Sequence, residues 1–436
     1  MNLNEEEYAD VMEEIFEIVE TEIDNQLLRY SNATGFSTMV IDTCMDYLIE
    51  IGEIQEWFDV CDDSHDAYLR NMVQHAYETV IHETMEIPTR QTSYDSWSDE
   101  GPDVPTETMA IVNAAPIQKQ RSPEWYETRR QLFSASNLSK LFASESQYNS
   151  LIYEKCKPAE IRPDYGVSND RSPMNWGIKY EPVTVMIYED KNHTQINTNY
   201  GCIPHPTLPI GASPDGIVND KTSSKYGRMI EIKNIYNREI TGIPSEEYWV
   251  QMQAQMETCD LPYCDFVETR IKEYESQEAF LEGTHEYKGI ILFLLPAHPS
   301  PSTLNQFVYM PVNTPEPLEW LHNQQIKMEE EGLYVIYEKT YWYLDEYSCV
   351  LVKRNAPWFA KTVPIIKEAW DIVVKERIEG YEHRAPQKRV PKFEETLVTS
   401  DVLQPETNDH GIQNIKIVPN AICLIKLDEN GNVFKT

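Results

Sequence analysis

The stretch that decides the fold of this chain, residues 210–235, opens as IGASPDGIV and closes as MIEIKNI. Apolar and charged residues alternate along the closing part, which is the period-2 pattern of a β-strand. Because side chains alternate along a strand, Glu231 and Lys233 lie on the same face. The polar segment DKTSSKYG between the two parts predicts a turn. We therefore expect a hairpin in which Asp215 meets Glu231.

Two carboxylates and one ammonium group in a small site have a definite chemical use. Carboxylates are the hard oxygen ligands that Mg²⁺ prefers, and a bound Mg²⁺ keeps several waters. Such a metal lowers the pKa of a bound water and neutralises charge that develops on a phosphodiester. Lys233 would hold that water or stabilise the developing charge. The alternative is a solvent-facing hairpin with ordinary surface charges, because Pro-Asp followed by Glu-x-Lys also occurs by chance.

The composition predicts a soluble intracellular protein. The chain has 436 residues, enough for two or three domains, and its hydrophobic content is 41%. No apolar run approaches the ~20 residues that span a bilayer, and the opening MNLNEEEYAD does not resemble a signal peptide. The eight cysteines include no Cys-x-x-Cys pair, so neither a zinc site nor a disulfide framework is predicted.

The negative charge is concentrated at the N-terminal end. The formal net charge is −35, which alone argues against a nucleic-acid partner. Residues 1–110 hold 27 acidic and 3 basic residues, a net of −24, whereas residues 111–270 hold 20 and 17, a net of −3. The nearly neutral middle of the chain therefore remains compatible with a DNA partner.

The N-terminal quarter predicts an acidic helical bundle over residues 1–87. Apolar residues recur at helical spacing in three runs, 5–30, 39–51 and 68–81. Such a module is either a solvated interaction module or a mimic of nucleic-acid charge. Residues 88–116, rich in Pro, Ser and acidic residues, predict a linker.

Two helices predicted in the middle of the chain carry candidate site residues. In RSPEWYETRRQLFSASNLSKLF, Arg129 precedes serines at the start of a further helix. Arginine and a hydroxyl beside a helix N-terminus suit a phosphate, although a charged surface helix with a serine cap is the alternative. In SPMNWGIKYEPVTVMIYED, Glu181 lies close to an apolar helix face. Pro182 follows it directly and predicts that the helix bends or restarts there.

The segment SEEYWVQMQAQMETCDL predicts a helix with three glutamines. Gln251 and Gln255 share one helix face, and Gln253 lies away from it. Glutamines beside a metal site can bond to water or phosphate, but they are as often plain surface residues.

The C-terminal half predicts four strands and two helices. The strands are YKGIILFLLP, NQFVYMPV, GLYVIYEKTYWYL and SCVLVKRN, and the helices are PLEWLHNQQIKMEEEG and residues 356–380. Residues 381–436 predict a tail that ends in a hairpin with an Asn-Gly turn.

In order and spacing, five motifs resemble the lambda-exonuclease-like (YqaJ-type viral recombinase) family of the PD-(D/E)XK nuclease superfamily. They are EWYETRRQLFSAS (124–136), NWGIKYE (175–181), SPDG (213–216), EIK (231–233) and YWVQMQ (248–253). The resemblance covers about 117–270 and 333–380. The size and the additional segments resemble versions from large eukaryotic DNA viruses.

The resemblance implies an α/β (α+β) fold: a restriction-endonuclease-like core, with a central mixed sheet flanked by helices, besides the N-terminal helical bundle. The nuclease domain would span 117–380, with an insertion at 271–332. The family implies a catalytic role for Asp215, Glu231 and Lys233, and metal ligation by Glu181, Asp215, Glu231 and the carbonyl of Ile232. It implies that Arg129 and Ser136 bind a 5′-phosphate and that Gln253 contacts DNA, whereas the helix geometry favours Gln251 for that contact.

The predicted function is a Mg²⁺-dependent exonuclease, with Mn²⁺ as a substitute, that digests linear double-stranded DNA from the 5′ end for recombination or repair. The expected partners are DNA ends and a single-strand annealing or recombination protein, with no membrane and with a homo-oligomer left open. If the chain is viral, it would act in the host cytoplasm (a viral factory) or nucleus. A structure-specific endonuclease and a non-catalytic DNA-repair scaffold are the alternatives.

Overall fold

The computed structural model describes residues 5–26, 33–51, 63–84, 104–118, 122–159, 166–169, 171–300 and 303–385. The predicted C-terminal hairpin and residues 88–103 of the predicted linker lie outside this part of the chain. The helices are α1 (Glu5–Asn25), α2 (Ala33–Ile51), α4 (Asp63–Thr84), α5 (Thr106–Asn113), α6 (Pro123–Arg130), α7 (Ala135–Leu138), α8 (Glu145–Cys156), α9 (Pro173–Asn192), α10 (Glu246–Cys259), α11 (Gln277–Glu282), α12 (Pro317–Glu331) and α13 (Ala356–Glu379). Among the described helices, none is long and apolar enough to cross a membrane.

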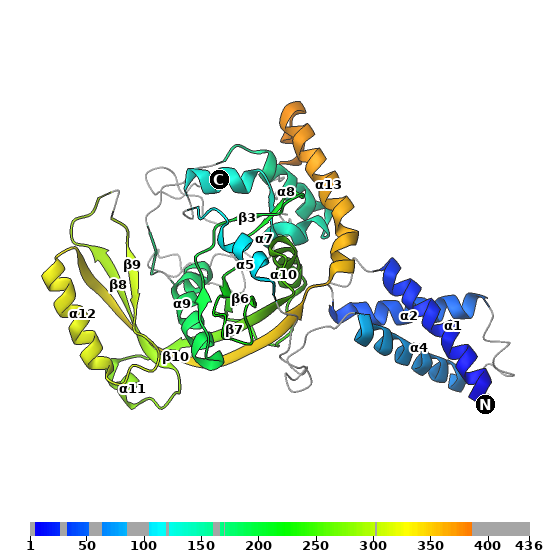
Figure 1. Cartoon of the computed structure of the whole chain (residues 1–436), viewed down its shortest axis with the longest axis horizontal. Helices are drawn as coiled ribbons and strands as arrows, with labels where there is room; N and C mark the ends of the chain where they lie inside the picture. The colour runs from blue at the N-terminus through cyan, green and yellow to red at the C-terminus, as the bar shows by residue number, and fades with distance from the viewer. Residues whose placement is uncertain are drawn as a thin grey trace, which may run out of the picture. The chain divides into compact units, whose positions relative to one another are not determined.

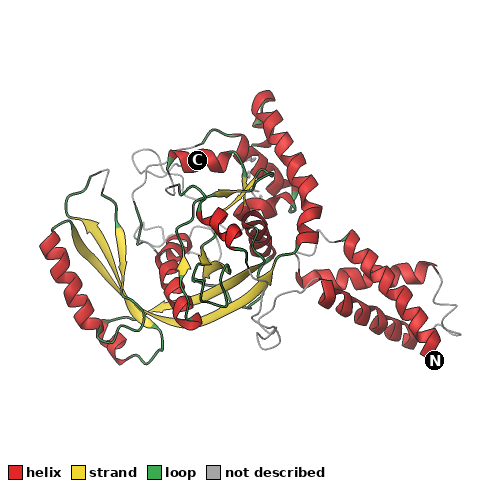
Figure 2. Cartoon of the chain, viewed as in Figure 1, coloured by secondary structure: helices red, strands yellow, loops and turns green. Residues whose placement is uncertain are grey.

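The strands form one large and one small sheet (Figure 2). The large sheet has the order β2 (Ile196–Asn197), β5 (Gly216–Val218), β6 (Met229–Asn234), β7 (Tyr263–Glu273), β10 (Tyr334–Lys353), β8 (Lys288–Pro296) and β9 (Gln306–Tyr309). The small sheet has the order β1 (Phe133–Ser134), β4 (Ile210–Ala212) and β3 (Ile203–Pro204). In the large sheet β6 and β7 are parallel and the other pairs are antiparallel. The α/β class and the mixed sheet flanked by helices are confirmed.

The unit β6–α10–β7 is the centre of the architecture. Parallel neighbours cannot be joined by a tight turn, and here α10 makes the crossover between them (Figure 1). The alternation along β6 separates two environments. Ile230 and Ile232 pack with Tyr188 of α9 on one side of the sheet, whereas Glu231 accepts hydrogen bonds from α10 on the other side. Because side chains alternate along β6, Glu231 points to the side of the sheet that α10 covers.

α9 runs without interruption from Pro173 to Asn192, with Pro182 inside it, so the prediction that the helix restarts there is wrong. Proline removes one backbone donor from the helix. Tyr180 before the proline and Val183 after it are fully buried in one cluster against the sheet. Packing on both sides of Pro182 holds the helix together.

The insertion predicted at 271–332 extends the central sheet. β8 and β9 continue it beyond β10, and α11 and α12 pack against them around a small core that includes Phe280, Leu292 and Met328 (Figure 1). β10 is one strand of 20 residues that pairs with both β7 and β8. The two separate strands predicted within 332–355 are therefore wrong.

At the N-terminal end, α1, α2 and α4 confirm the predicted helical bundle, with a core that includes Ile15, Val40 and Val73. α5 lies inside the range predicted as linker. Its Met109 and Val112 are buried, and the Tyr200 hydroxyl donates a hydrogen bond to the Asn113 side chain. Residues 104–118 therefore have contacts typical of a folded domain.

A buried ion pair ties the β5–β6 turn to the sheet. Asp265 of β7 is fully buried and accepts hydrogen bonds from Arg228 and from the Tyr188 hydroxyl, each at 2.7 Å, while Lys225 lies 3.5 Å away. Burial alone raises the pKa of Asp265, but the two cations and the hydroxyl outweigh it and hold the pKa below its ordinary value.

We expect Asp265→Asn to destabilise the protein by about 3–5 kcal/mol at neutral pH, because it removes the negative charge from a buried ion pair with Arg228. Since the folded-state pKa is lowered, this stabilisation is present above the unfolded pKa of about 3.9 and is lost as the pH falls through the folded value. Urea unfolding at several pH values measures the difference between wild type and variant. Asp260→Asn, at an exposed ion pair, is the control and should change stability by at most about 1 kcal/mol. A difference for Asp265→Asn as small as that of the control would contradict this account.

Candidate active site

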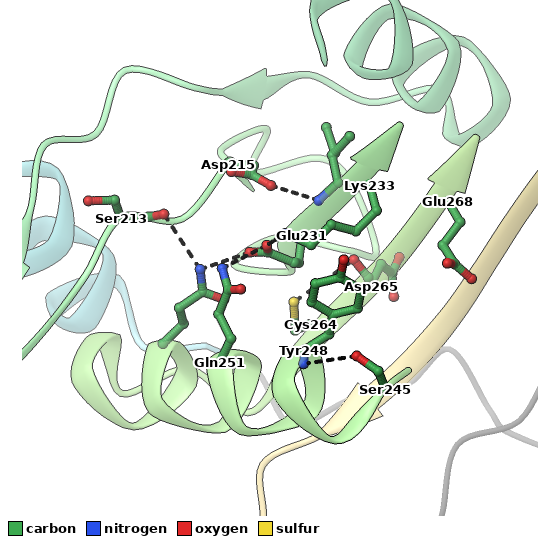
Figure 3. A network of polar contacts seen from close by, with 12 residues as sticks. Ser213, Asp215, Glu231, Lys233, Ser245, Tyr248, Gln251, Cys264, Asp265 and Glu268 are labelled. Carbon is green, nitrogen blue, oxygen red and sulfur yellow. Dashed lines mark hydrogen bonds and ion pairs between the residues drawn. The ribbon is translucent and has the colours of Figure 1, made fainter. Parts of the chain in front are cut away.

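The β5–β6 hairpin brings Asp215 to Glu231 (Figure 3). Gly216 pairs with Ile230 in antiparallel register, so Asp215 lies one residue before the pair and Glu231 one residue after it. The Asp215 carboxylate accepts a hydrogen bond of 2.7 Å from the backbone N–H of Ile232. The hairpin predicted from the sequence therefore forms, and the two carboxylates lie opposite each other at the end away from its turn.

The Glu231 carboxylate is 1% exposed and is held by three donors. Its Oε1 accepts from Lys233 Nζ at 2.5 Å and from Gln251 Nε2 at 2.7 Å. Its Oε2 accepts from Gln255 Nε2 at 2.8 Å. A buried charge is tolerated only when it is paired and hydrogen-bonded, and these three groups meet that requirement.

Lys233 is the cation of the site. Burial alone lowers its pKa, but the charges of Glu231 and Asp215 outweigh burial and raise the pKa. Its Nζ lies 4.7 Å from the ring centroid of Tyr248, which adds a cation–π contact. The lysine therefore stays protonated and has a fixed position between the carboxylates and the first turn of α10.

Negative charge exceeds positive charge in this site. Burial, followed by the charge of Glu231, raises the pKa of both Asp215 and Glu181, and Glu181 further raises that of Asp215. Lys233 opposes both shifts without cancelling them. Three carboxylates and one ammonium group thus share one electrostatic environment: the three groups expected from the hairpin, together with Glu181.

The turn of α9 that carries Glu181 is fixed by its two preceding residues. Lys179 Nζ donates to Glu273 at 3.0 Å and to Thr340 at 2.8 Å, and the Tyr180 hydroxyl donates to Glu273 at 2.7 Å. The Tyr309 hydroxyl donates to the carbonyl of Lys179 at 3.0 Å. Glu273 and Tyr309 belong to the predicted insertion, which therefore helps to hold the turn that bears Glu181.

The donor set fits a hard divalent cation in its chemistry. Three carboxylates with one ammonium group leave uncompensated negative charge, and oxygen ligands suit Mg²⁺ or Mn²⁺ rather than a soft metal. Within the described residues, however, no three His, Cys, Asp or Glu side chains form a preassembled metal-binding group. Both Glu231 oxygens are turned toward Lys233 and the glutamines. Metal ligation by Glu181, Asp215, Glu231 and Ile232 therefore stays a prediction.

The predicted phosphate-binding residues come together through Ser134. Arg129 Nη2 donates to the Ser134 hydroxyl at 3.2 Å, and the Ser136 hydroxyl donates to the same oxygen at 3.3 Å. Ser134 pairs with Gly211 in the parallel β1–β4 pair, four residues before Asp215. Ser134 thus lies on the strand beside the one that leads into the carboxylate site, and Arg129 and Ser136 come to it from the two flanking helices, α6 and α7.

Arg129 also lines a cavity that the sequence did not predict. The Arg129 guanidinium lies 4.7 Å from the ring centroid of Trp125, and the carbonyl of Arg129 accepts from the buried Lys155 Nζ at 2.9 Å. These residues and Tyr153 line a pocket of about 530 Å³. The sequence did not predict that Trp125 and Lys155 line one cavity, because they lie on different helices, α6 and α8, that pack together only in the fold.

The three glutamines of α10 have different surroundings. Gln251 and Gln255 face Glu231, as the helix period predicted. Gln253 is 1% exposed, donates to the carbonyl of Lys353 at 2.8 Å and accepts from the N–H of Asn355 at 2.7 Å. It therefore joins α10 to the end of β10, and these bonds leave it turned away from the carboxylates. The DNA contact that the family implied for Gln253 stays a prediction, and Gln251 bonds to Glu231.

We expect Gln253→Met to lower the free energy of unfolding by about 1–3 kcal/mol, because the buried N–H of Asn355 loses its acceptor. Denaturant unfolding of the variant and the wild type measures this difference. An unchanged free energy of unfolding would show that Gln253 is not a structural link and would return it to the candidates for DNA contact.

Comparison with known proteins gives one family. Residues 124–262 match the YqaJ-like viral recombinase domain. The uncharacterized protein R354 of Acanthamoeba polyphaga mimivirus is 25% identical over 303 residues, which are 61% of this chain. The match covers 54% of R354, so the chain spans about half the length of this curated relative.

Two crystal structures of LHK-Exo, an alkaline exonuclease from Laribacter hongkongensis, are also similar. One of them is a complex with dAMP. They are 20% and 19% identical to this chain, and each match covers 60% of this chain and 95% of the other, with a TM-score of 0.33. A TM-score of this size supports no argument about the geometry of the site.

Proposed function

Residues 124–262 of this chain belong to the YqaJ-like viral recombinase family, as the ordered motifs predicted, and we propose that the protein is a metal-dependent deoxyribonuclease. It hydrolyses phosphodiester bonds of linear double-stranded DNA from the end, in the 5′-to-3′ direction. The observation that carries this proposal is the Glu231 carboxylate, which is buried beside Asp215 and Lys233 and held by two glutamines.

Each residue of the site has a proposed role. Asp215, Glu231, Glu181 and the carbonyl of Ile232 would hold Mg²⁺, for which Mn²⁺ can substitute. When bound, the ion supplies an acidified water and neutralises charge on the phosphate. Lys233 keeps its proton and presents a fixed positive charge to the oxygen that becomes negative during cleavage. Its raised pKa favours this electrostatic role over proton abstraction.

We expect Asp215→Asn, Glu231→Gln and Lys233→Ala each to lower the cleavage rate by at least ~10²–10³, because each removes a ligand or a charge-stabilising group. The measurement is Mg²⁺-dependent release of nucleotides from end-labelled linear duplex DNA. Glu319→Gln on the exposed face of α12 is the control. Wild-type rates in any of the three variants, with contaminating nuclease excluded, would contradict the proposed site.

The 5′-to-3′ direction rests on the Arg129–Ser134–Ser136 cluster. Guanidinium and hydroxyl donors suit a terminal 5′-phosphate, and the cluster is centred on Ser134, whose strand pairs with the one that approaches Asp215. Arg129 is preorganised by Trp125 and Ser134, so little side-chain freedom would be lost when an anion binds.

We expect 5′-phosphorylated duplex to be digested faster than 5′-hydroxyl duplex, and Arg129→Ala to reduce this preference. Initial rates on the two substrates measure the effect, with Arg70→Ala in the N-terminal bundle as the control. Equal rates on both substrates in the wild-type protein would contradict the proposed 5′-phosphate site and would favour a structure-specific endonuclease.

The acidic bundle lies outside the proposed chemistry. None of the proposed site residues belongs to α1, α2 or α4. The charge of residues 1–110, a net of −24, repels DNA and suits a basic partner, such as a single-strand annealing or recombination protein. We propose that this region recruits such a partner and serves recombination or repair.

A further inference from the structure

We propose that Gln255 is a positioning residue that fixes the Glu231 carboxylate for cleavage, an inference that rests on the proposed nuclease function. The family motif that ends at Gln253 does not include Gln255. Gln255 is 1% exposed, and its Nε2 donates to Glu231 Oε2 at 2.8 Å. The other two donors to Glu231, Lys233 and Gln251, both bond to its Oε1 atom.

Two amides from one face of α10 hold the two ends of the carboxylate. Gln251 and Gln255 are four residues apart, so they project from the same helix face one turn apart. Because each amide bonds to a different oxygen, the carboxylate can neither rotate about its axis nor tilt toward one partner. Figure 3 shows Gln251 extending from α10 toward Glu231 on β6.

The orientation of the Gln255 amide follows from its partner. An ionised carboxylate only accepts hydrogen bonds, so the Gln255 NH₂ group must face it. The flipped amide would place a carbonyl oxygen against a carboxylate oxygen, where two acceptors repel. The Oε1 atom of Gln255 therefore points away from Glu231.

Burying the Gln255 amide has an energetic cost for folding. Gln255 Oε1 is buried and has no hydrogen-bond partner among the described residues. An unsatisfied buried acceptor destabilises the folded state, and an apolar side chain of the same shape avoids that penalty. We attribute the presence of glutamine at this buried position to its hydrogen bond with Glu231, which holds the carboxylate in place.

Gln255 also reaches the segment that carries the second carboxylate. Its Nε2 lies 3.5 Å from the carbonyl oxygen of Ser213, two residues before Asp215. Asp215 in turn accepts a hydrogen bond from the N–H of Ile232, the residue after Glu231. One amide thus links the strand that bears Glu231 to the loop that bears Asp215, and a change at Gln255 should alter the spacing of both.

The test compares isosteric variants on α10. Gln255→Met keeps the volume and removes the donor. We expect it to lower kcat by about 10–100-fold, which is typical when a group that orients a metal-binding carboxylate is lost. The KM for duplex DNA should change little. The melting temperature should fall, because the buried Glu231 Oε2 loses a donor. Gln255→Leu is a second variant of similar volume and should behave in the same way.

Two other buried positions of the same helix serve as controls. Gln253→Met removes a glutamine whose bonds link α10 to β10, so its melting temperature should fall. Thr258→Val removes a buried hydroxyl that bonds only within the helix, at the carbonyl of Ala254, and should leave kcat unchanged.

Wild-type kcat in Gln255→Met and Gln255→Leu would overturn the inference. A loss of kcat of the same size in Thr258→Val would also overturn it, because it would show that losing any buried hydrogen bond of α10 lowers the rate. The Glu231→Gln variant separates this failure from that of the proposed function. If Glu231→Gln is inactive and Gln255→Met is fully active, only the role of Gln255 fails; if both are active, the proposed function fails as well.

Discussion

A carboxylate that is removed from water must be matched by donors, and the rest of this structure depends on how Glu231 meets that requirement. Lys233 comes from the same strand, because residues two apart on β6 share a face. Gln251 and Gln255 come from α10, which lies over that face because β6 and β7 are parallel and need a crossover helix. The parallel pairing of β6 and β7 therefore also places the two glutamines beside Glu231.

Asp215 and Glu181 are held differently, by elements farther away in the sequence. Asp215 depends on the hairpin register and on one backbone N–H. Glu181 depends on a helix turn that Tyr309 and Glu273 of the insertion help to fix. Burial and mutual repulsion raise the pKa of both carboxylates, so their ionised forms are disfavoured in the protein alone, and a bound cation would favour them. The insertion thus takes part in the geometry of the site as well as in the extent of the sheet.

Local patterns predicted the elements of this site, and long-range contacts decided their partners. The alternation of residues 229–235 and the turn signals before them were enough for the hairpin, and the helix period was enough to separate Gln253 from the other two glutamines. The partners of Gln253 lie about a hundred residues away, at Lys353 and Asn355, so no local pattern could identify them. β10 was predicted as two strands because the acidic residues near its middle interrupt the apolar run, where the structure has a bulge between Leu344 and Glu346.

The central claim, that the carboxylate–lysine site cleaves DNA from its ends with a divalent metal, is tested most directly on wild-type protein with two matched DNA molecules. One is a linear duplex and the other is the same sequence as a covalently closed circle, each incubated with Mg²⁺ or with EDTA. The account predicts nucleotide release from the linear duplex with Mg²⁺, none with EDTA, and an intact circle. Cleavage of the circle, or digestion of the linear DNA in EDTA, would contradict it.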